Sequence, residues 1–363
     1  MFKHLVSENI LNLNPYSPGK PIEELKREIG LPHIIKLASN ENPLGPSPQA
    51  IRAILNELPR VSLYPEGSCH NLRKKLATYL NVSCEQLLFG NGSNEIIELL
   101  VRTFCLEKDE VMTADYAFII YELVGRAHGC YIHRVPMKNY SYDLEGLAAA
   151  ITDRTKLIFI ANPNNPTGSY INGTDLTGFL RKTQNKNLLV VLDEAYFEYV
   201  HKSDYPNGID LLKTFPHLVV LRTFSKIYGL AGFRIGYAIA HSDILSCMNR
   251  IKAPFNVNYL AQVAACAAIE DVTFIKKTLE IFKEGFSYLY SQLSKLGFVC
   301  HPSVGNFHFV DLRRQAAAIY EKLLKNGVII RPLKPYGLDQ HCRISVGTME
   351  ENQMLIAALK TIL

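Results

Sequence analysis

Long apolar runs and paired cysteines are both missing from this 363-residue chain. No apolar stretch is long enough to cross a bilayer as a helix, and residues 1–9 (MFKHLVSEN) lack the apolar core of a signal peptide. The eight cysteines are dispersed without a Cys-x-x-Cys pair, and no His/Cys spacing matches a zinc site. We therefore expect a cytoplasmic protein with free thiols, no metal site and no membrane partner.

A strong excess of charge is missing as well. The formal net charge is only +5, and the densest basic stretch, Arg73-Lys74-Lys75, lies in helix-like sequence that predicts a solvated face. No nucleic-acid partner is therefore expected. The chain also has no Gly-x-x-x-x-Gly-Lys-Ser/Thr loop, which argues against a P-loop NTPase, and no internal repeat. The mild positive balance suits a site for phosphates and carboxylates.

What the chain does have is a regular alternation of apolar runs and helix-like stretches after residue 84. Such an alternation predicts an α/β fold with a mostly parallel sheet flanked by helices. The gap between the last two runs is too short for a helix, so we expect one antiparallel pairing there. The predicted strands are 87–89, 110–114, 131–137, 157–161, 188–192, 217–221 and 235–240, and the helices include 94–105, 117–128, 144–151 and 176–184.

The two ends of the chain follow different patterns. Residues 1–45 are rich in Pro, Asn and Gly and predict an extended arm with one short buried strand near residues 34–38. After residue 255, a long helical stretch at 259–297 precedes short strands and two helices, which indicates a smaller α+β domain. We therefore predict an arm that is partly in the small domain (1–45), a large domain (46–255) and a small C-terminal domain (256–363).

Three segments of the predicted large domain carry polar groups where strands end. Residues 89–95 (FGNGSNE) place a glycine turn before a helix, whose free N–H groups can bind an anion, although helix capping alone would explain Ser93 and Asn94. Residues 161–168 (ANPNNPTG) end another strand at the edge where α/β proteins bind ligands. Asp193 ends a fully apolar strand, where a buried carboxylate needs a cation such as a protonated ring nitrogen or magnesium.

Lys226 follows the next apolar run, in residues 221–236 (LRTFSKIYGLAGFRIG). Thr223, Ser225 and Arg234 lie close to it in sequence and could hold a phosphate. A lysine beside a bound phosphate and a carbonyl can form a Schiff base. For a lone lysine a surface position would be the ordinary interpretation, but the long surrounding pattern favours a lysine joined to pyridoxal phosphate.

Taken in order, these segments resemble the fold-type I pyridoxal-phosphate enzymes, in the aminotransferase class that includes the histidinol-phosphate aminotransferases. The resemblance covers essentially the whole chain. It rests on residues 40–45 (NENPLG), 64–67 (YPEG), 90–93 (GNGS), 165–168 (NPTG), 193–196 (DEAY), 225–226 (SK) and 342–347 (CRISVG).

The resemblance implies a role for each polar residue at the cofactor. Lys226 would be the catalytic lysine that binds pyridoxal 5'-phosphate and moves protons. Asp193 would pair with the ring nitrogen, and Asn165 and Tyr196 with the ring oxygen. Phe118 would stack on the ring, and the phosphate would be held by Gly92, Ser93, Asn94, Thr223, Ser225 and Arg234.

Other implied roles concern the substrate and a second subunit. Arg343 would bind the substrate carboxylate with Asn42 nearby, and Arg331 and Tyr16 would bind the substrate phosphate. Tyr64 would reach the cofactor phosphate of a neighbouring subunit, which implies a homodimer with shared active sites.

Two positions depart from the family pattern. Many relatives have aspartate where this chain has Asn94, and the segment before Phe118 lacks a proline that is often present there. The second departure leaves the register of the ring-stacking residue open.

The activity implied is a two-step amino transfer in histidine biosynthesis: L-histidinol phosphate and 2-oxoglutarate give imidazole acetol phosphate and L-glutamate. A broad-specificity aromatic aminotransferase and an enzyme that decarboxylates threonine phosphate are alternatives on the same fold. A regulator that senses pyridoxal phosphate would need a DNA-binding module, for which residues 1–45 are too short and too irregular.

Overall fold

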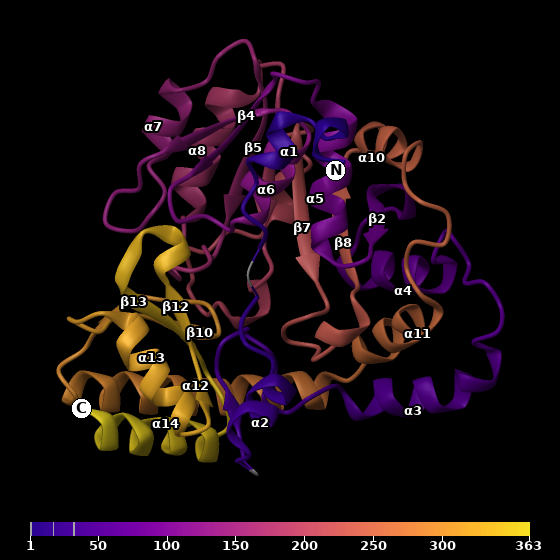
Figure 1. The fold of residues 1–363 in the computed structure, drawn as a ribbon. Coiled ribbons are helices and arrows are strands. Elements are labelled where there is room, and N and C mark those ends of the chain that lie inside the picture. The colour runs from indigo at the N-terminus through magenta and orange to yellow at the C-terminus, as the bar shows by residue number, and fades with distance from the viewer. Residues whose placement is uncertain (1, 17, 32) are drawn as a thin grey trace.

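The computed structural model describes residues 2–16, 18–31 and 33–363, which form two structural units around a seven-stranded and a four-stranded sheet, with a two-stranded sheet, β1-β11, besides (Figure 1). The larger sheet has seven strands in the order β2-β8-β7-β6-β5-β3-β4. Neighbours from β7 through β4 pair in parallel, whereas β8 is antiparallel to both β7 and β2. The strands are β2 (Leu87–Gly90), β3 (Glu110–Ala114), β4 (Tyr131–Val135), β5 (Thr155–Ala161), β6 (Leu189–Asp193), β7 (Leu218–Thr223) and β8 (Gly236–Ala240).

The central strands of this sheet are apolar on both faces because helices cover them. Val190, Val191 and Leu192 of β6 are fully buried, as expected for a parallel strand between two helical layers. The helices of this unit are α3 (Pro48–Glu57), α4 (His70–Leu80), α5 (Ser93–Phe104), α6 (Ile120–Ala127), α7 (Leu144–Ala149), α8 (Gly173–Thr183), α9 (Gly208–Leu211), α10 (Ser242–Asn249) and α11 (Tyr259–Ala268).

The smaller unit has a four-stranded antiparallel sheet in the order β12-β13-β10-β9. It packs with three helices in the lower left of Figure 1 and has its own apolar core. Its elements are α12 (Val272–Lys295), β9 (Val299–His301), β10 (Phe307–Asp311), α13 (Ala316–Lys325), β11 (Val328–Ile329), β12 (Arg331–Leu333), β13 (Leu338–Ser345) and α14 (Met349–Ile362).

The N-terminal arm connects the two units. It begins with α1 (Glu8–Leu11), whose Asn9 side chain donates to the last carbonyls of α6, on Arg126 and Ala127, at 3.1 and 3.0 Å. It continues through α2 (Ile22–Ile29) to β1 (Ile35–Lys36), which pairs in parallel with β11 of the smaller unit. The arm therefore runs along the boundary where a ligand could bind.

The predicted fold class is confirmed, including the antiparallel β7–β8 pairing. The prediction of one helical stretch over 259–297 was wrong in one respect, because residues 269–271 interrupt the helix and separate α11 from α12. Asp271 causes this break by capping α12 through Phe274 N and by accepting a 2.6 Å hydrogen bond from Ser47 Oγ. Since α11 belongs to the larger core, we propose that the units divide near residue 271 rather than at residue 255.

In the part of the chain that the structure describes, no helix combines the length and the apolar character needed to span a bilayer. In the same residues, no group of three or more His, Cys, Asp or Glu side chains is arranged to hold a metal ion.

Candidate active site

A cavity of about 420 Å³ opens where β5, β6 and β7 end, between the larger sheet, the N-terminal arm and the smaller unit. The carboxyl ends of parallel strands are the usual ligand edge of an α/β sheet. Thirteen of the predicted site residues line the cavity: Tyr16, Ser93, Asn94, Phe118, Asn165, Asp193, Tyr196, Thr223, Ser225, Lys226, Arg234, Arg331 and Arg343.

Lys226 extends into this cavity from the loop that follows β7. The loop is held close to the arm, because Gly229 has a φ of +69° and a Cβ there would lie 2.0 Å from the carbonyl oxygen of Gly45. Lys226 Nζ donates a 3.1 Å hydrogen bond to the carbonyl oxygen of Ser39. Burial, and then the charges of Arg343 and Arg234, lower the pKa of Lys226 to about 7. Its amine can therefore lose and regain a proton near neutral pH.

This lowered pKa predicts how the stability of cofactor-free protein depends on pH. Between about pH 7 and 10, the unfolded lysine binds more protons than the folded lysine, so the free energy of unfolding rises with pH. We expect wild type to gain up to about 1.4 kcal/mol per pH unit relative to Lys226→Met over this window. Urea unfolding of both proteins at pH 7, 8 and 9 measures the difference. A constant difference would contradict the lowered pKa.

Asp193 ends β6 on the cavity side and is 5% exposed. One carboxylate oxygen accepts a 2.7 Å hydrogen bond from Tyr121 Oη, and the other accepts one from Ala195 N at 3.1 Å. Burial raises the pKa of Asp193, while these two hydrogen bonds and the charge of Lys226 oppose the rise. A cationic ring nitrogen at this carboxylate would supply the charge that burial otherwise makes costly.

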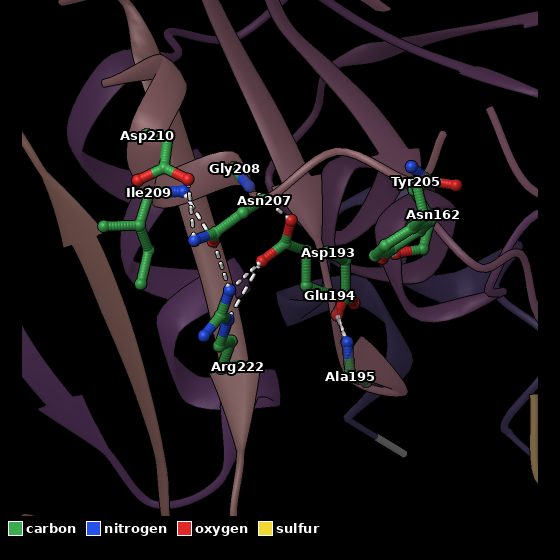
Figure 2. A network of polar contacts seen from close by, with 10 residues as sticks. All are labelled: Asn162, Asp193, Glu194, Ala195, Tyr205, Asn207, Gly208, Ile209, Asp210 and Arg222. Atoms are coloured by element: carbon green, nitrogen blue, oxygen red, sulfur yellow. Dashed lines mark hydrogen bonds and ion pairs between the residues drawn. The ribbon is translucent and has the colours of Figure 1, made fainter. Parts of the chain in front are cut away.

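A buried ion pair lies beside Asp193 (Figure 2). Arg222 Nη2 lies 2.8 Å from Glu194 Oε2, and both side chains are almost fully buried. Gly208 N donates to the other Glu194 oxygen at 2.8 Å, and Asn207 Oδ1 accepts from Arg222 Nη2 at 2.8 Å. Glu194 directly follows Asp193, the last residue of β6, and Arg222 precedes Thr223, the last residue of β7, so the pair fixes the ends of both strands that lead to the cavity.

Breaking this pair is expected to destabilise the fold strongly. Arg222→Ala should lower the free energy of unfolding by about 3–5 kcal/mol, because it leaves the Glu194 carboxylate buried without its cation. Arg102→Ala is the control, because its 3.4 Å pair with Glu98 is exposed and should contribute less than about 1 kcal/mol. Urea denaturation compares the variants, and equal losses would contradict this assignment.

A second group of cavity residues is suited to an anion. Ser93 and Asn94 open α5, whose N-terminal N–H groups carry the positive end of the helix dipole. Thr223 and Ser225, which carry hydroxyl groups, line the same cavity. Arg234 lies against Gly92, where a Cβ would approach the Arg234 Nη2 atom to 2.4 Å. Gly92 thus does not line the cavity, but its lack of a side chain makes room for the guanidinium.

Tyr196, Asn165 and Phe118 also line the cavity. Tyr196 Oη accepts a 2.9 Å hydrogen bond from Asn40 Nδ2, and Asn165 Oδ1 accepts one from Arg343 Nη1. Phe118 lines the cavity in an edge-to-face contact with Tyr121, with ring centroids 5.6 Å apart. The structure therefore brings Phe118 to the site, although its predicted stacking on a ligand ring stays a prediction.

Two arginines enter from the smaller unit. Among the described residues, Arg343 on β13 hydrogen-bonds only the neutral oxygens of Asn165 and Ala38, and its buried Nε atom has no hydrogen-bond partner there. Burial lowers the pKa of Arg343, as expected for a cation placed to meet an anion from outside the chain. Arg331 on β12 lies over the ring of Tyr16, with Cζ 5.7 Å from the ring centroid.

Besides Gly92, two predicted residues do not line this cavity. Asn42 is buried elsewhere: its amide donates to the Ile227 carbonyl at 2.8 Å and to Thr278 Oγ1 at 3.2 Å, and its oxygen accepts from Leu44 N. The structure therefore does not place Asn42 beside a substrate carboxylate, as was predicted. Its side chain instead holds the backbone of the loop that carries Lys226. Tyr64 is 84% exposed and stacks on Phe255, outside the cavity.

Three further residues shape the site and were not predicted from the sequence. Tyr121 binds Asp193, Asn40 binds Tyr196, and Tyr336 lines the cavity from the smaller unit. The first two occur in segments already singled out, but nothing in their local pattern shows which side chain they meet. Tyr336 follows no motif, and only the tertiary structure places it here.

Comparison with known proteins gives a consistent result. Residues 32–359 match the family described as aminotransferase class I and II. The chain is 46% identical to the histidinol-phosphate aminotransferase of Moorella thermoacetica, over 98% of this chain and 92% of that protein. It is 43% identical to histidinol-phosphate aminotransferase 1 of Nitrosococcus oceani, over 100% and 98% of the two chains.

Solved structures agree in fold. The histidinol-phosphate aminotransferase of Sinorhizobium meliloti, in complex with pyridoxal-5'-phosphate, superposes with a TM-score of 0.90 and 28% identity over 99% of this chain and 98% of that one. A double mutant of Thermus thermophilus aspartate aminotransferase has a TM-score of 0.85 at 22% identity, over 98% of each chain, which shows the shared fold alone.

Proposed function

Because the chain belongs to the class I and II aminotransferase family, which depends on pyridoxal phosphate, we propose that it transfers an amino group from L-histidinol phosphate to 2-oxoglutarate. The products would be imidazole acetol phosphate and L-glutamate, and the reaction would run in either direction in one site. The observation that carries the proposal is a single cavity lined by the amine of Lys226, the acid of Asp193 and the anion-binding residues around Arg234.

The cavity fits pyridoxal 5'-phosphate by its donor set. Asp193 is a buried acid that has no ion-pair partner among the described residues, although the charge of Lys226 opposes the rise in its pKa. Ser93, Thr223 and Arg234 line the same cavity and supply hydrogen-bond donors for a phosphate. A volume of about 420 Å³ lies in the range of cofactor-sized pockets. When bound, this cofactor would supply an electron sink that stabilises negative charge at the substrate α-carbon.

Each residue then has a defined task. Lys226, with its pKa lowered to about 7, would accept a proton from the substrate α-carbon and return a proton on the cofactor side. Asp193 would hold a proton on the ring nitrogen, and Tyr121 would keep that carboxylate oriented. Asn165 and Tyr196 would hold the ring oxygen from the cavity wall.

The substrate end would use the two arginines of the smaller unit. Arg343, whose guanidinium meets only neutral oxygens among the described residues, would bind the 2-oxoglutarate and glutamate carboxylate by a two-point contact. Arg331 and Tyr16 would bind the phosphate of histidinol phosphate. One site could then accept a carboxylate and a phosphate in turn.

A homodimer forms part of the proposal. Apolar side chains are exposed together along α3 and the segment after it: Ile51, Leu55, Leu58, Val61, Leu63 and Tyr64. A cavity of about 730 Å³ lies beside this face, lined by Tyr64 and Tyr259. Such a continuous apolar face is typical of an interface. Tyr64 would reach the cofactor phosphate of a second copy. Sedimentation velocity would test the dimer, and cofactor titration of Tyr64→Phe would test the Tyr64 contact.

The deciding experiment is a substrate panel. Purified protein supplied with pyridoxal phosphate is mixed with 2-oxoglutarate and either L-histidinol phosphate, L-phenylalanine, L-tyrosine or O-phospho-L-threonine. We expect glutamate formation with the highest kcat/KM for L-histidinol phosphate. Equal or greater values for the aromatic amino acids would favour a broad aromatic aminotransferase. Release of carbon dioxide from O-phospho-L-threonine would favour a decarboxylase.

A further inference from the structure

Asn40 is a fully buried residue of the N-terminal arm that has no role in the proposed function so far. It lies between the two units, next in sequence to Ser39 and Glu41, which line the cavity, and its φ of +54° is in the left-handed region that asparagine tolerates better than most residues. Its side chain reaches Tyr196 of the larger unit, and its backbone and side chain reach Ser345 of the smaller unit. Asn40 thus connects the smaller unit to a residue of the cavity.

The hydrogen bonds around Asn40 fix which way each group points. Asn40 N donates to Ser345 Oγ at 2.8 Å, so the Ser345 hydroxyl proton is left to donate to Asn40 Oδ1, also at 2.8 Å. This places the amide NH₂ of Asn40 toward Tyr196, where Nδ2 lies 2.9 Å from Tyr196 Oη. An amide NH₂ only donates, so Tyr196 Oη must accept in this contact.

The backbone of Asn40 is fixed in the same way. Its carbonyl oxygen accepts a 3.1 Å hydrogen bond from Asn306 Nδ2, and Asn306 is buried on the smaller unit. Every polar group of Asn40 except one amide hydrogen therefore has a named partner on another segment. The side chain has no freedom to turn its oxygen toward Tyr196 without losing the Ser345 contact.

From this polarity we infer that Asn40 is a positioning residue that makes the Tyr196 hydroxyl donate its own proton into the cavity, to the oxygen of the cofactor ring. The inference rests on the proposed function, since it needs pyridoxal phosphate in the cavity. Ser345 acts one step further away by setting the orientation of the Asn40 amide. The chain of donors runs from Ser345 through Asn40 to Tyr196 and then to the ligand.

The consequence concerns the proton affinity of the bound cofactor. A hydrogen bond donated to the ring oxygen stabilises negative charge there, so the cofactor releases its proton at lower pH. If Tyr196 instead donates away from the cavity, the cofactor keeps its proton to higher pH. The other charged groups near Tyr196 are Arg343, Asp193 and Lys226, and all three stay unchanged in the variants proposed here.

The test is a pH titration of the visible absorbance of the holoprotein, without substrate. Asn40→Asp keeps the size and the tolerance for positive φ, but it replaces the amide donor by an acceptor to which Tyr196 will donate. We expect the midpoint of the titration to rise by about one pH unit, a tenfold change in proton affinity, and to approach the midpoint of Tyr196→Phe. Ser345→Ala adds no charge and should shift the midpoint in the same direction by less.

A double variant separates this role from a general effect of a new charge or a disturbed fold. In a Tyr196→Phe background, Asn40→Asp should cause no further shift, because the group through which Asn40 acts is gone. An equal shift with and without the Tyr196 hydroxyl would overturn the inference, as would unchanged midpoints in both Asn40→Asp and Ser345→Ala. A wild-type protein without any visible absorbance would instead remove the proposed cofactor, and the inference with it.

Discussion

Lys226→Ala is expected to lower kcat for amino transfer by at least about 10³-fold, which is the loss typical of removing a positioned acid–base group. The variant lacks the only amine that lines the described part of the cavity, and no other lysine lies within that wall to replace it. The substrate KM should change much less, because Arg331 and Arg343 remain. Single-turnover absorbance measurements with L-histidinol phosphate report the rate directly.

Two companion variants define what this loss means. Lys226→Arg keeps a positive charge but cannot be neutral near pH 7, so it should be as inactive as Lys226→Ala if proton transfer is the lost step. Lys213→Ala, at an exposed position, should retain wild-type activity. An added small primary amine should restore part of the rate of Lys226→Ala. Activity of Lys226→Ala within tenfold of wild type would rule out the proposed role of this amine.

The strands that carry the site were predictable because they are short apolar runs with polar residues at their ends. Asp193 and Thr223 each end such a run, and the parallel β6–β7 pairing then brings the following segments to one edge. The antiparallel β7–β8 pairing was predictable from the short gap. The position of β2 beside β8 was not, because nothing local in residues 87–90 indicates a partner almost 150 residues later.

The rest of the site depends on contacts between distant segments. Asn42 and Asn40 lie two residues apart in one motif, yet one is directed to the backbone of Ile227 and the other to Tyr196. The left-handed backbone at Asn40 separates them, and although asparagine tolerates this conformation better than most residues, the sequence does not show which asparagine of the motif adopts it. Tyr121 follows the same logic: one face of α6 is apolar, and only the packed structure shows that this tyrosine meets a carboxylate.

Asp193→Ala is expected to have the second large effect, through both cofactor binding and rate. The variant removes the anion that would hold a proton on the ring nitrogen, and it leaves Tyr121 Oη without its buried acceptor. We expect kcat to fall by at least about 10²-fold and the cofactor to bind more weakly. Asp193→Glu should recover part of both, since it restores the charge but not the 2.7 Å contact geometry.

Tyr121→Phe isolates the contribution of the hydrogen bond. It keeps the ring that stacks on Phe159, with centroids 4.7 Å apart, and removes only the donor to Asp193. Without that donor the pKa of Asp193 should rise, because the hydrogen bond opposes the effect of burial. A smaller loss of kcat than in Asp193→Ala is therefore expected, and it should be greatest at low pH, where the carboxylate takes up a proton first.

Asp243→Asn, at an exposed position, is the matched control for Asp193→Ala and should leave kcat and cofactor affinity unchanged. If Asp193→Ala kept wild-type kcat and cofactor affinity, the carboxylate at the end of β6 would have no part in holding the ring, and the orientation of the cofactor in this cavity would have to be reversed.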